Sequence, residues 1–195
     1  MDFEGAKKYT LERLSNELSK QLHYHSVEHT LDVLDAVSRL GELEKVNDHE
    51  MALLKTAALF HDLGFIETYN GHEEVSIRIA NEVLPAYGYS PEDLKVIDGL
   101  IRSTEIPQTP QTHLEQIMAD ADLDYLGRDD IYVIGQRLQY EWQLHGIVSS
   151  LREWHEKQLK FLKVHNYFTE SAKKLRDKRK QENIKELEIL MCVKK

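Results

Sequence analysis

Apolar residues recur at three- and four-residue spacing along most of the 195-residue chain, a pattern that predicts α-helices. The expected helices cover approximately residues 4–20, 26–40, 49–62, 73–86, 91–103, 112–121, 129–145, 149–164 and 168–191. No stretch shows the apolar–polar alternation of a good strand. We therefore expect an all-α fold, a bundle of helices with a helical extension at the C-terminus.

Several predicted helices begin or end at residues that are favoured at helix termini. Ser26 can cap the helix that follows it, and Gly41 suits the turn at the far end. The stretch "SPED" at 90–93 combines a serine cap, proline at the first position and acidic residues in the first turn. Either Asn47 or Asp48 can cap the helix predicted over 49–62. These signals mark the starts of three helices.

The helix over 49–62 is the most apolar and therefore the best candidate for a central, buried element. Its expected buried residues are Leu53, Leu54, Ala57, Ala58 and Leu59. It ends in "AALFHDLGF", where His61 and Asp62 directly follow the apolar run. A charged pair at such a place costs solvation free energy unless a partner compensates it. The His61–Asp62 pair therefore indicates a functional site at the end of this helix.

Few breaks punctuate the chain, since it contains four prolines and nine glycines, and we find no internal repeat. We expect one core domain over residues 1–165. The remaining residues, 166–195, carry charges of both signs at three- and four-residue spacing, which is typical of a solvated helix face. We expect this helix to pack on the core or to extend from it.

The formal net charge of -9 argues against a broad nucleic-acid-binding surface, which needs an excess of Lys and Arg. Cys192 is the single cysteine, so no disulfide can form within the chain, and a reducing cytoplasm is the expected location. The N-terminal residues do not resemble a signal peptide, and no apolar run approaches the length of a membrane span. The oligomeric state stays open, with a homodimer as one alternative.

Ten histidines are many for this length, and they are unevenly placed. His25 and His29 lie four residues apart, so they share a face if that stretch is helical. Imidazole nitrogens and carboxylate oxygens together are ligands for a divalent metal ion such as Mn, Mg, Fe, Co, Ni or Zn. The residues that offer such groups near predicted helix ends are His29, His61, Asp62, His72, Asp120, Asp122 and Asp124.

Four segments together resemble the HD superfamily of metal-dependent phosphohydrolases. They are "HTLDV", "LLKTAALFHDLG", "GHEEVSIRIANEVL" and "ADADLDYLG", and the resemblance covers residues 22 to about 130. The segment "YHSVEHT" also resembles an element of the cyclic nucleotide phosphodiesterases, which share the superfamily's core. The resemblance implies a helical HD-domain core and a metal-dependent phosphohydrolase within residues 1–165.

The resemblance implies one divalent metal ion held by His29, His61, Asp62 and Asp122. Asp62 stands where dinuclear members have the residue that bridges two metals. The alanine–aspartate pair occurs twice, at 119–120 and 121–122, so Asp120 stays an alternative to Asp122 as the last ligand.

His72 matches a histidine that helps to hold a second metal or contacts the substrate phosphate in many members. The second-site histidine that dinuclear members carry about one helix later is absent from "LIRSTEIPQTP", which favours one metal per chain. The His61–Asp62 dyad is followed by Leu63, Gly64 and Phe65. These residues lack the glycine–tyrosine–proline signature of one subgroup of the superfamily.

The implied reaction is hydrolysis of a phosphomonoester or phosphodiester by metal-activated water. Asp62 is the candidate base that orients the water, and His25 is the candidate acid for the leaving group. Arg102 and Arg128, with His72, are candidates for binding the substrate phosphate.

The sequence thus predicts a phosphohydrolase acting on a small phosphorylated substrate, with a nucleotide as the leading class. Two alternatives stay open. One is a cyclic nucleotide phosphodiesterase, which His25 supports. The other is a regulatory HD module that binds metal without turnover, which the intact set of ligands argues against.

Overall fold

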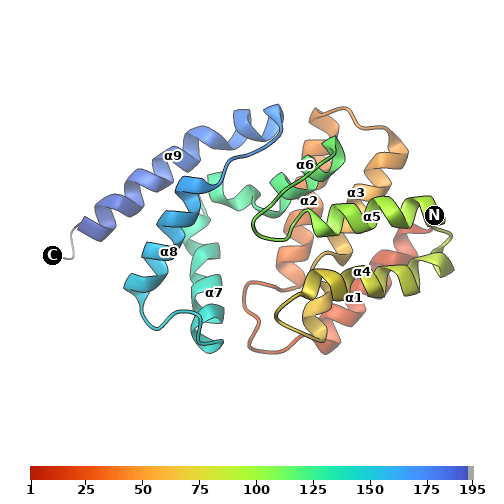
Figure 1. Ribbon diagram of the computed structural model, residues 1–195, viewed down its shortest axis with the longest axis horizontal. Coiled ribbons are helices and arrows are strands. Elements are labelled where there is room, and N and C mark those ends of the chain that lie inside the picture. The colour runs from red at the N-terminus through yellow and green to blue at the C-terminus, as the bar shows by residue number, and fades with distance from the viewer. Residues whose placement is uncertain (193–195) are drawn as a thin grey trace. The chain divides into compact units, whose positions relative to one another are not determined.

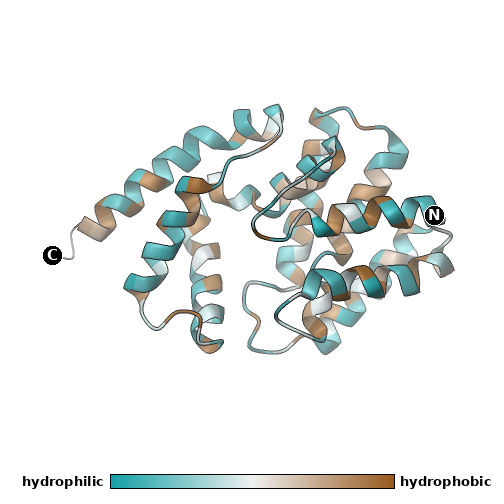
Figure 2. Ribbon diagram, viewed as in Figure 1, coloured by the Kyte–Doolittle hydropathy of each residue, from teal (hydrophilic) through white to brown (hydrophobic). Residues whose placement is uncertain are grey.

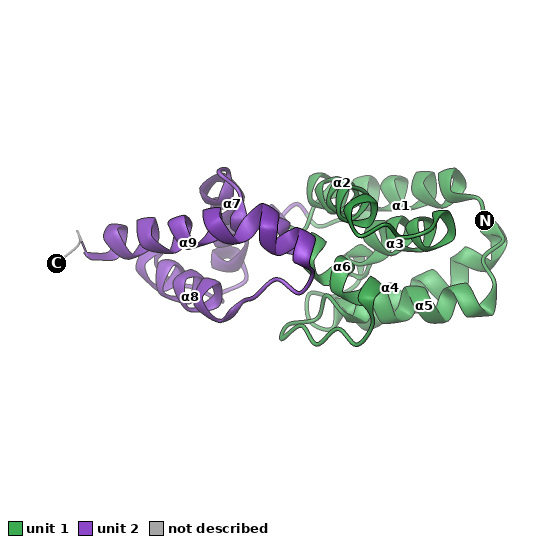
Figure 3. Ribbon diagram, turned by 90° about the horizontal axis from the view of Figure 1, so that it is seen from above, with its two compact units in different colours: residues 1–19, 25–122 green, residues 20–24, 123–195 purple. Residues whose placement is uncertain are grey.

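The computed structural model describes residues 1–192, and within this range it contains nine α-helices, three short 3-10 helices and no strand (Figure 1). This confirms the all-α prediction. The predicted C-terminal helix over 168–191 lies within the described residues, whereas the last three residues of the predicted C-terminal region 166–195 lie outside them. The chain divides into two compact units, one of residues 1–19 and 25–122 and one of residues 20–24 and 123–195 (Figure 3). No described helix is both long and apolar enough to cross a membrane.

Six α-helices and two 3-10 helices form the first unit, and their bounds differ from the predicted ranges by a few residues. They are α1 (Phe3–Glu17), α2 (Val27–Leu43), α3 (Asp48–Phe60), η1 (Leu63–Ile66), α4 (His72–Val83), η2 (Leu84–Tyr87), α5 (Pro91–Arg102) and α6 (His113–Asp122). The predicted N-terminal caps are present, whereas the prediction for Gly41 is wrong, because α2 continues through Gly41 to Leu43. Ser26 accepts from the backbone N–H of His29, and Asn47 and Ser90 each form a reciprocal capping box with the residue three positions later.

Helix α3 lies at the centre of the first unit, in contact with α1, α2, α4, α5 and α6. The predicted core residues of α3 are buried, and Leu54, Ala57, Ala58, Leu59 and Phe60 are fully inaccessible to solvent. Burying a leucine or phenylalanine side chain of this kind stabilises a fold by about 1.5–3 kcal/mol. The central helix is therefore a rigid support for the His61–Asp62 pair at its end.

The second unit consists of η3 (Asp124–Gly127), α7 (Ile131–Leu144), α8 (Leu151–Val164) and α9 (Glu170–Cys192). Helix α9 is mostly hydrophilic, as its sequence predicts (Figure 2). The core of this unit contains Tyr24 and Leu123 together with residues of all four elements. The buried Glu141 accepts hydrogen bonds from the backbone N–H groups of His23 and Tyr24, each 2.9 Å long. Segment 20–24 is thereby attached to α7.

Gly64 permits a close approach between the turn after the dyad and the first turn of α4. A Cβ atom on Gly64 would lie 2.0 Å from the backbone oxygen of His72, far inside van der Waals contact. We predict that Gly64→Ala lowers the free energy of unfolding by about 1–3 kcal/mol, because the backbone of α4 must move away. Urea denaturation followed by circular dichroism measures the change.

The matched control is Gly99→Ala in α5, where an added Cβ would meet only the flexible end of the Glu115 side chain. Alanine is favoured over glycine by roughly 1 kcal/mol inside a helix, so this variant should be as stable as the original chain or more so. Equal stability losses for the two variants would contradict the role given to Gly64.

Candidate metal centre

Four side chains from three separate segments of the first unit converge at the end of α3. His29 lies in the first turn of α2, His61 and Asp62 follow α3 directly, and Asp122 is the last residue of α6. All four are largely shielded from solvent, with side-chain exposures of 7%, 1%, 7% and 13% respectively. The structure therefore brings together residues that lie up to 93 positions apart in the sequence (122 − 29 = 93).

The facing atoms are evenly spaced. The Nε2 atoms of His29 and His61 are 3.3 Å apart, and Oδ1 of Asp122 lies 3.2 Å and 3.4 Å from them. Oδ2 of Asp62 lies 3.4 Å and 3.2 Å from the same two nitrogens. Ligand atoms around one ion, at metal–ligand distances of roughly 2.0–2.2 Å, are spaced by roughly 3–3.5 Å. The observed spacing fits a shared divalent ion.

The donor chemistry also fits a metal ion. Nδ1 of His61 lies 2.9 Å from the backbone oxygen of Ala58, so its N–H donates there and Nε2 is left to face the cluster. Oδ2 of Asp62 is buried and accepts no hydrogen bond of normal geometry from the described residues. A buried carboxylate oxygen without a hydrogen bond is costly, and a bound cation would satisfy it. His29, His61 and Asp122 each also place a ligand atom within 4.8 Å of the others.

The shifted pKa values of the cluster residues also indicate that a positive charge is favoured there. Burial alone would raise the pKa of Asp122, but hydrogen bonds from His29 and His61 outweigh it and lower this pKa to about 2. Burial likewise opposes the ionisation of Asp62, yet His61 and His72 hold its pKa well below the usual range. The pKa of His61 is raised well above its ordinary value, because Asp62 and Asp122 outweigh desolvation. The two carboxylates thus favour a cation in contact with them, either a proton on His61 or a metal ion.

A family model for the HD domain matches residues 26–124, which is half of the chain and includes all four converging residues. The chain belongs to the HD-domain family. This confirms the resemblance that the sequence shows. HD domains bind divalent metal ions, and the cluster of His29, His61 and Asp122 is where the described residues offer such a site.

Two solved structures have the same fold as this HD-domain chain. One is a predicted HD superfamily hydrolase from an uncultured Thermotogales bacterium, with 21% identity, a TM-score of 0.64 and coverage of 97% of this chain and 91% of that one. The other is a protein from Lactobacillus plantarum, with 16% identity, a TM-score of 0.69 and coverage of 98% and 97%. At these identities the likeness shows the fold. No curated protein sequence matches the chain.

Three further candidate residues from the sequence are His72, His25 and Asp120. The two histidines lie near the cluster, and Asp120 lies two residues before Asp122 in the sequence. Nε2 of His72 is 3.3 Å from Oδ1 of Asp62, so Asp62 presents one oxygen to His72 and the other to His29 and His61. The ring of His25 stacks on Phe65 at a centroid distance of 4.1 Å, and its centroid lies 6.1 Å from those of His29 and His72. Asp120 is fully buried, and Asp122 is the aspartate whose Oδ1 lies against His29 and His61.

The two predicted phosphate-binding arginines have carboxylate partners. Arg102 in α5 forms an ion pair with Glu74 in α4. Arg128, in the second unit, donates to both carboxylate oxygens of Asp130 at 2.9 Å and 2.6 Å. Phosphate binding by either arginine stays a prediction, and it requires that the arginine exchange a carboxylate for the substrate.

Ser76 is a residue that sequence reasoning missed. Its buried hydroxyl donates to the backbone oxygen of His61 at 2.7 Å and accepts from the N–H of Gly64 at 2.8 Å. It therefore joins the peptide groups before Asp62 and after Leu63. The only signal in the sequence is a serine on the apolar face of a helix, in line with Ile79 and Ala80.

We predict that Ser76→Ala lowers the free energy of unfolding by about 1–3 kcal/mol, because two buried backbone groups lose their partner. It should also weaken metal binding, since the turn that carries Asp62 loses its attachment to α4. Denaturant titration and a metal titration measure the two effects.

Ser38→Ala is the matched control. The hydroxyl of Ser38 donates only to the backbone oxygen of Leu34 in its own helix, at 2.7 Å, so its loss should be nearly neutral. Equal effects of the two substitutions on metal affinity would contradict the part assigned to Ser76.

Proposed function

We propose that the chain is a metal-dependent phosphohydrolase that hydrolyses a small phosphorylated substrate, with nucleotides as the leading class. The observation that carries the proposal is the convergence of two imidazole nitrogens and two carboxylates on one buried point, where Oδ2 of Asp62 accepts no normal hydrogen bond from the described residues. We propose His29, His61, Asp62 and Asp122 as the ligands of one divalent ion. When bound, such an ion polarises a phosphoryl oxygen and makes water more acidic.

Asp62 has two roles in this proposal, as a metal ligand and as a base. Its Oδ2 faces the two histidines, whereas its Oδ1 faces His72. This second oxygen, Oδ1, is the group proposed to orient an attacking water and to accept its proton. His72, which also lies 3.5 Å from Oε2 of Glu73, is held between two carboxylates and would face the substrate phosphate.

His25 is the proposed acid that protonates the leaving oxygen. It is half-buried beside the cluster, and its ring is held by stacking on the buried Phe65. It stands close enough to Asp62 for a charged His25 to lower the pKa of that carboxyl group. A general acid in such a position contributes about 10²–10⁴-fold to the rate.

A cyclic nucleotide phosphodiesterase is the second candidate function. The segment "YHSVEHT", which contains His25, favours it, because this segment resembles an element of the cyclic nucleotide phosphodiesterases. A panel of nucleoside monophosphates, diphosphates, triphosphates and cyclic nucleotides, each with Mn, Mg, Co, Ni, Fe or Zn, separates the two. Phosphate release identifies the first function, and ring opening without phosphate release identifies the second. Full metal occupancy without turnover of any substrate would favour a regulatory module.

The last metal ligand can be tested directly. We predict that Asp122→Asn reduces metal content to near zero and hydrolysis by at least about 100-fold, because the ion loses a charged ligand. Asp120→Asn should keep the metal, since Asp122 faces His29 and His61 in the structure. Metal analysis of the purified variants decides between the two residues. Metal loss in the Asp120 variant alone would assign the ligand to Asp120.

His25→Ala should reduce the turnover rate about 10²–10⁴-fold and leave metal content unchanged. Steady-state kinetics with the best substrate of the panel, together with metal analysis, checks both parts. Metal loss in this variant would make His25 a ligand. An unchanged rate would exclude it as the acid.

A further inference from the structure

The turn that follows Asp122 is held by hydrogen bonds from Tyr167. The chain passes from Asp122, the last residue of the first unit, directly into Leu123 and η3 of the second. The buried hydroxyl of Tyr167 donates to the backbone oxygens of Leu123 and Asp124, at 3.2 Å and 3.4 Å. One side chain thus bonds to the backbone oxygens of the first two residues after the proposed ligand.

Arg176 of α9 holds the same turn through Asp124. Nε and an Nη atom of Arg176 donate to the two carboxylate oxygens of Asp124, at 2.7 Å and 2.8 Å. Only 2% of the Asp124 side chain and 19% of the Arg176 side chain are exposed. Two parallel charge-assisted bonds shielded from water fix both the distance and the orientation of the groups.

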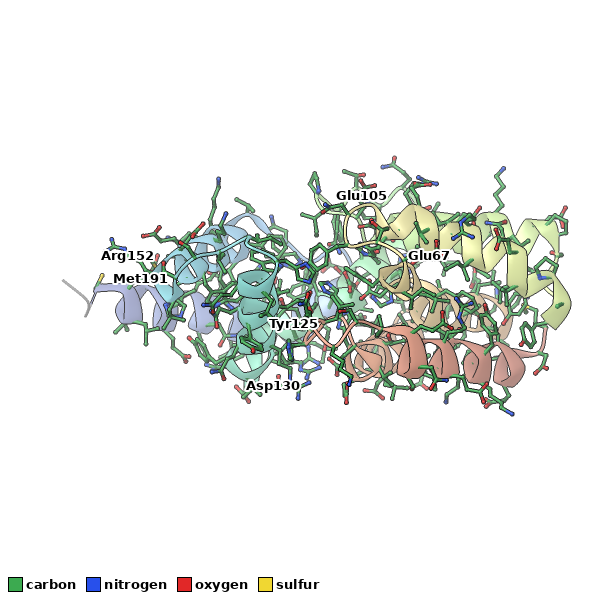
Figure 4. All side chains as sticks on the ribbon, turned by 90° about the horizontal axis from the view of Figure 1, so that it is seen from below. Glu67, Glu105, Tyr125, Asp130, Arg152 and Met191 are labelled. Carbon is green, nitrogen blue, oxygen red and sulfur yellow. The ribbon has the colours of Figure 1, made fainter. Side chains whose placement is uncertain are left out.

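Helix α9 also packs against the rest of this turn. The amide of Asn183 donates to the backbone oxygens of Leu126 and Arg128, at 3.0 Å and 3.1 Å. A Cβ atom on Gly127 would lie 2.6 Å from the backbone oxygen of Arg176, so glycine is needed for this approach. Figure 4 shows the side chains of this region, with Tyr125 of η3 and Asp130 at the start of α7 labelled. The turn is therefore attached along its whole length.

We propose that Tyr167 and Arg176 are positioning residues for Asp122, and that the C-terminal helix thereby sets the metal affinity of the HD domain. The inference rests on the proposed function in one respect, that Asp122 is a metal ligand. Neither residue touches the ligand cluster. They act by restricting residues 123 and 124, which directly follow Asp122, and so reduce the conformations open to the end of α6 before the ion binds.

The alternative is that these contacts only stabilise the second unit. The two explanations differ in their effect on metal binding by the folded protein. If the contacts position Asp122, their loss weakens metal binding, and bound metal in turn restrains the turn, because coupling between two sites is reciprocal. If they are merely structural, the metal dissociation constant stays unchanged well below the melting temperature.

Tyr167→Phe in the full-length chain tests the inference with the removal of a single hydroxyl. Mn²⁺ titration against a competing chelator, at a temperature where circular dichroism shows a folded protein, should give a dissociation constant about 10-fold higher than for the unmodified chain. Tyr140→Phe is the matched control, since Tyr140 is an exposed tyrosine of α7 in the same unit. It should leave the constant unchanged.

Arg176→Lys is the second variant, because it keeps the charge but loses the two-pronged bond to Asp124. It should also weaken Mn²⁺ binding. Folded Tyr167→Phe and Arg176→Lys variants that bind Mn²⁺ as tightly as the unmodified chain would overturn the inference and leave the proposed function intact. Absence of Mn²⁺ binding by the unmodified chain would instead reject the proposed function, and this inference with it.

Hydrogen exchange in the unmodified chain gives a readout that needs no variant. Bound Mn²⁺ should slow exchange of the backbone amides at residues 123–127, and exchange there that is independent of Mn²⁺ would contradict the coupling. This measurement also decides the question if either variant fails to fold.

Discussion

The structure depends on the balance of charge at one buried point. Asp62 and Asp122 place two carboxylates beside two imidazoles at the end of an apolar helix. An uncompensated buried ion costs several kcal/mol, so the cluster is stable only with positive charge inside it. The lowered pKa values of the aspartates and the raised pKa of His61 reflect this requirement for positive charge. A divalent ion meets it with twice the charge of a proton.

The scaffold around this point is built to keep it rigid. Helix α3 is buried among five neighbouring helices, and this holds His61 and Asp62 at a fixed place. Gly64 allows the turn after Asp62 to lie against α4, where Ser76 joins the peptide groups before Asp62 and after Leu63. Rigidity matters because ligand atoms displaced by about half an ångström no longer suit one ion.

Much of this arrangement could be predicted from the sequence, because its causes are local. Periodicity indicates the helices, and Ser26, Asn47 and Ser90 mark helix starts that the structure confirms. Residue chemistry and the family resemblance together indicate the residues that converge. The register of "ADAD" stayed open because both aspartates follow alanine; only the geometry shows Asp122 against the histidines.

Other features depend on contacts between distant residues and leave little trace in the sequence. Ser76 looks like any serine in a helix until its two backbone partners are known. Arg102 looks like a free cation until Glu74, 28 positions earlier, is found beside it. Arg176 and Asp124 are 52 positions apart, so their pairing depends on how α9 packs against η3.

Anomalous X-ray diffraction from crystals of the full chain grown with Mn²⁺ tests the central claim most directly. The account predicts one strong peak per chain, within roughly 2.0–2.3 Å of ligand atoms from His29, His61, Asp62 and Asp122. A fully occupied Mn²⁺ peak elsewhere in the chain, or no peak at these four residues at saturating Mn²⁺, would contradict it.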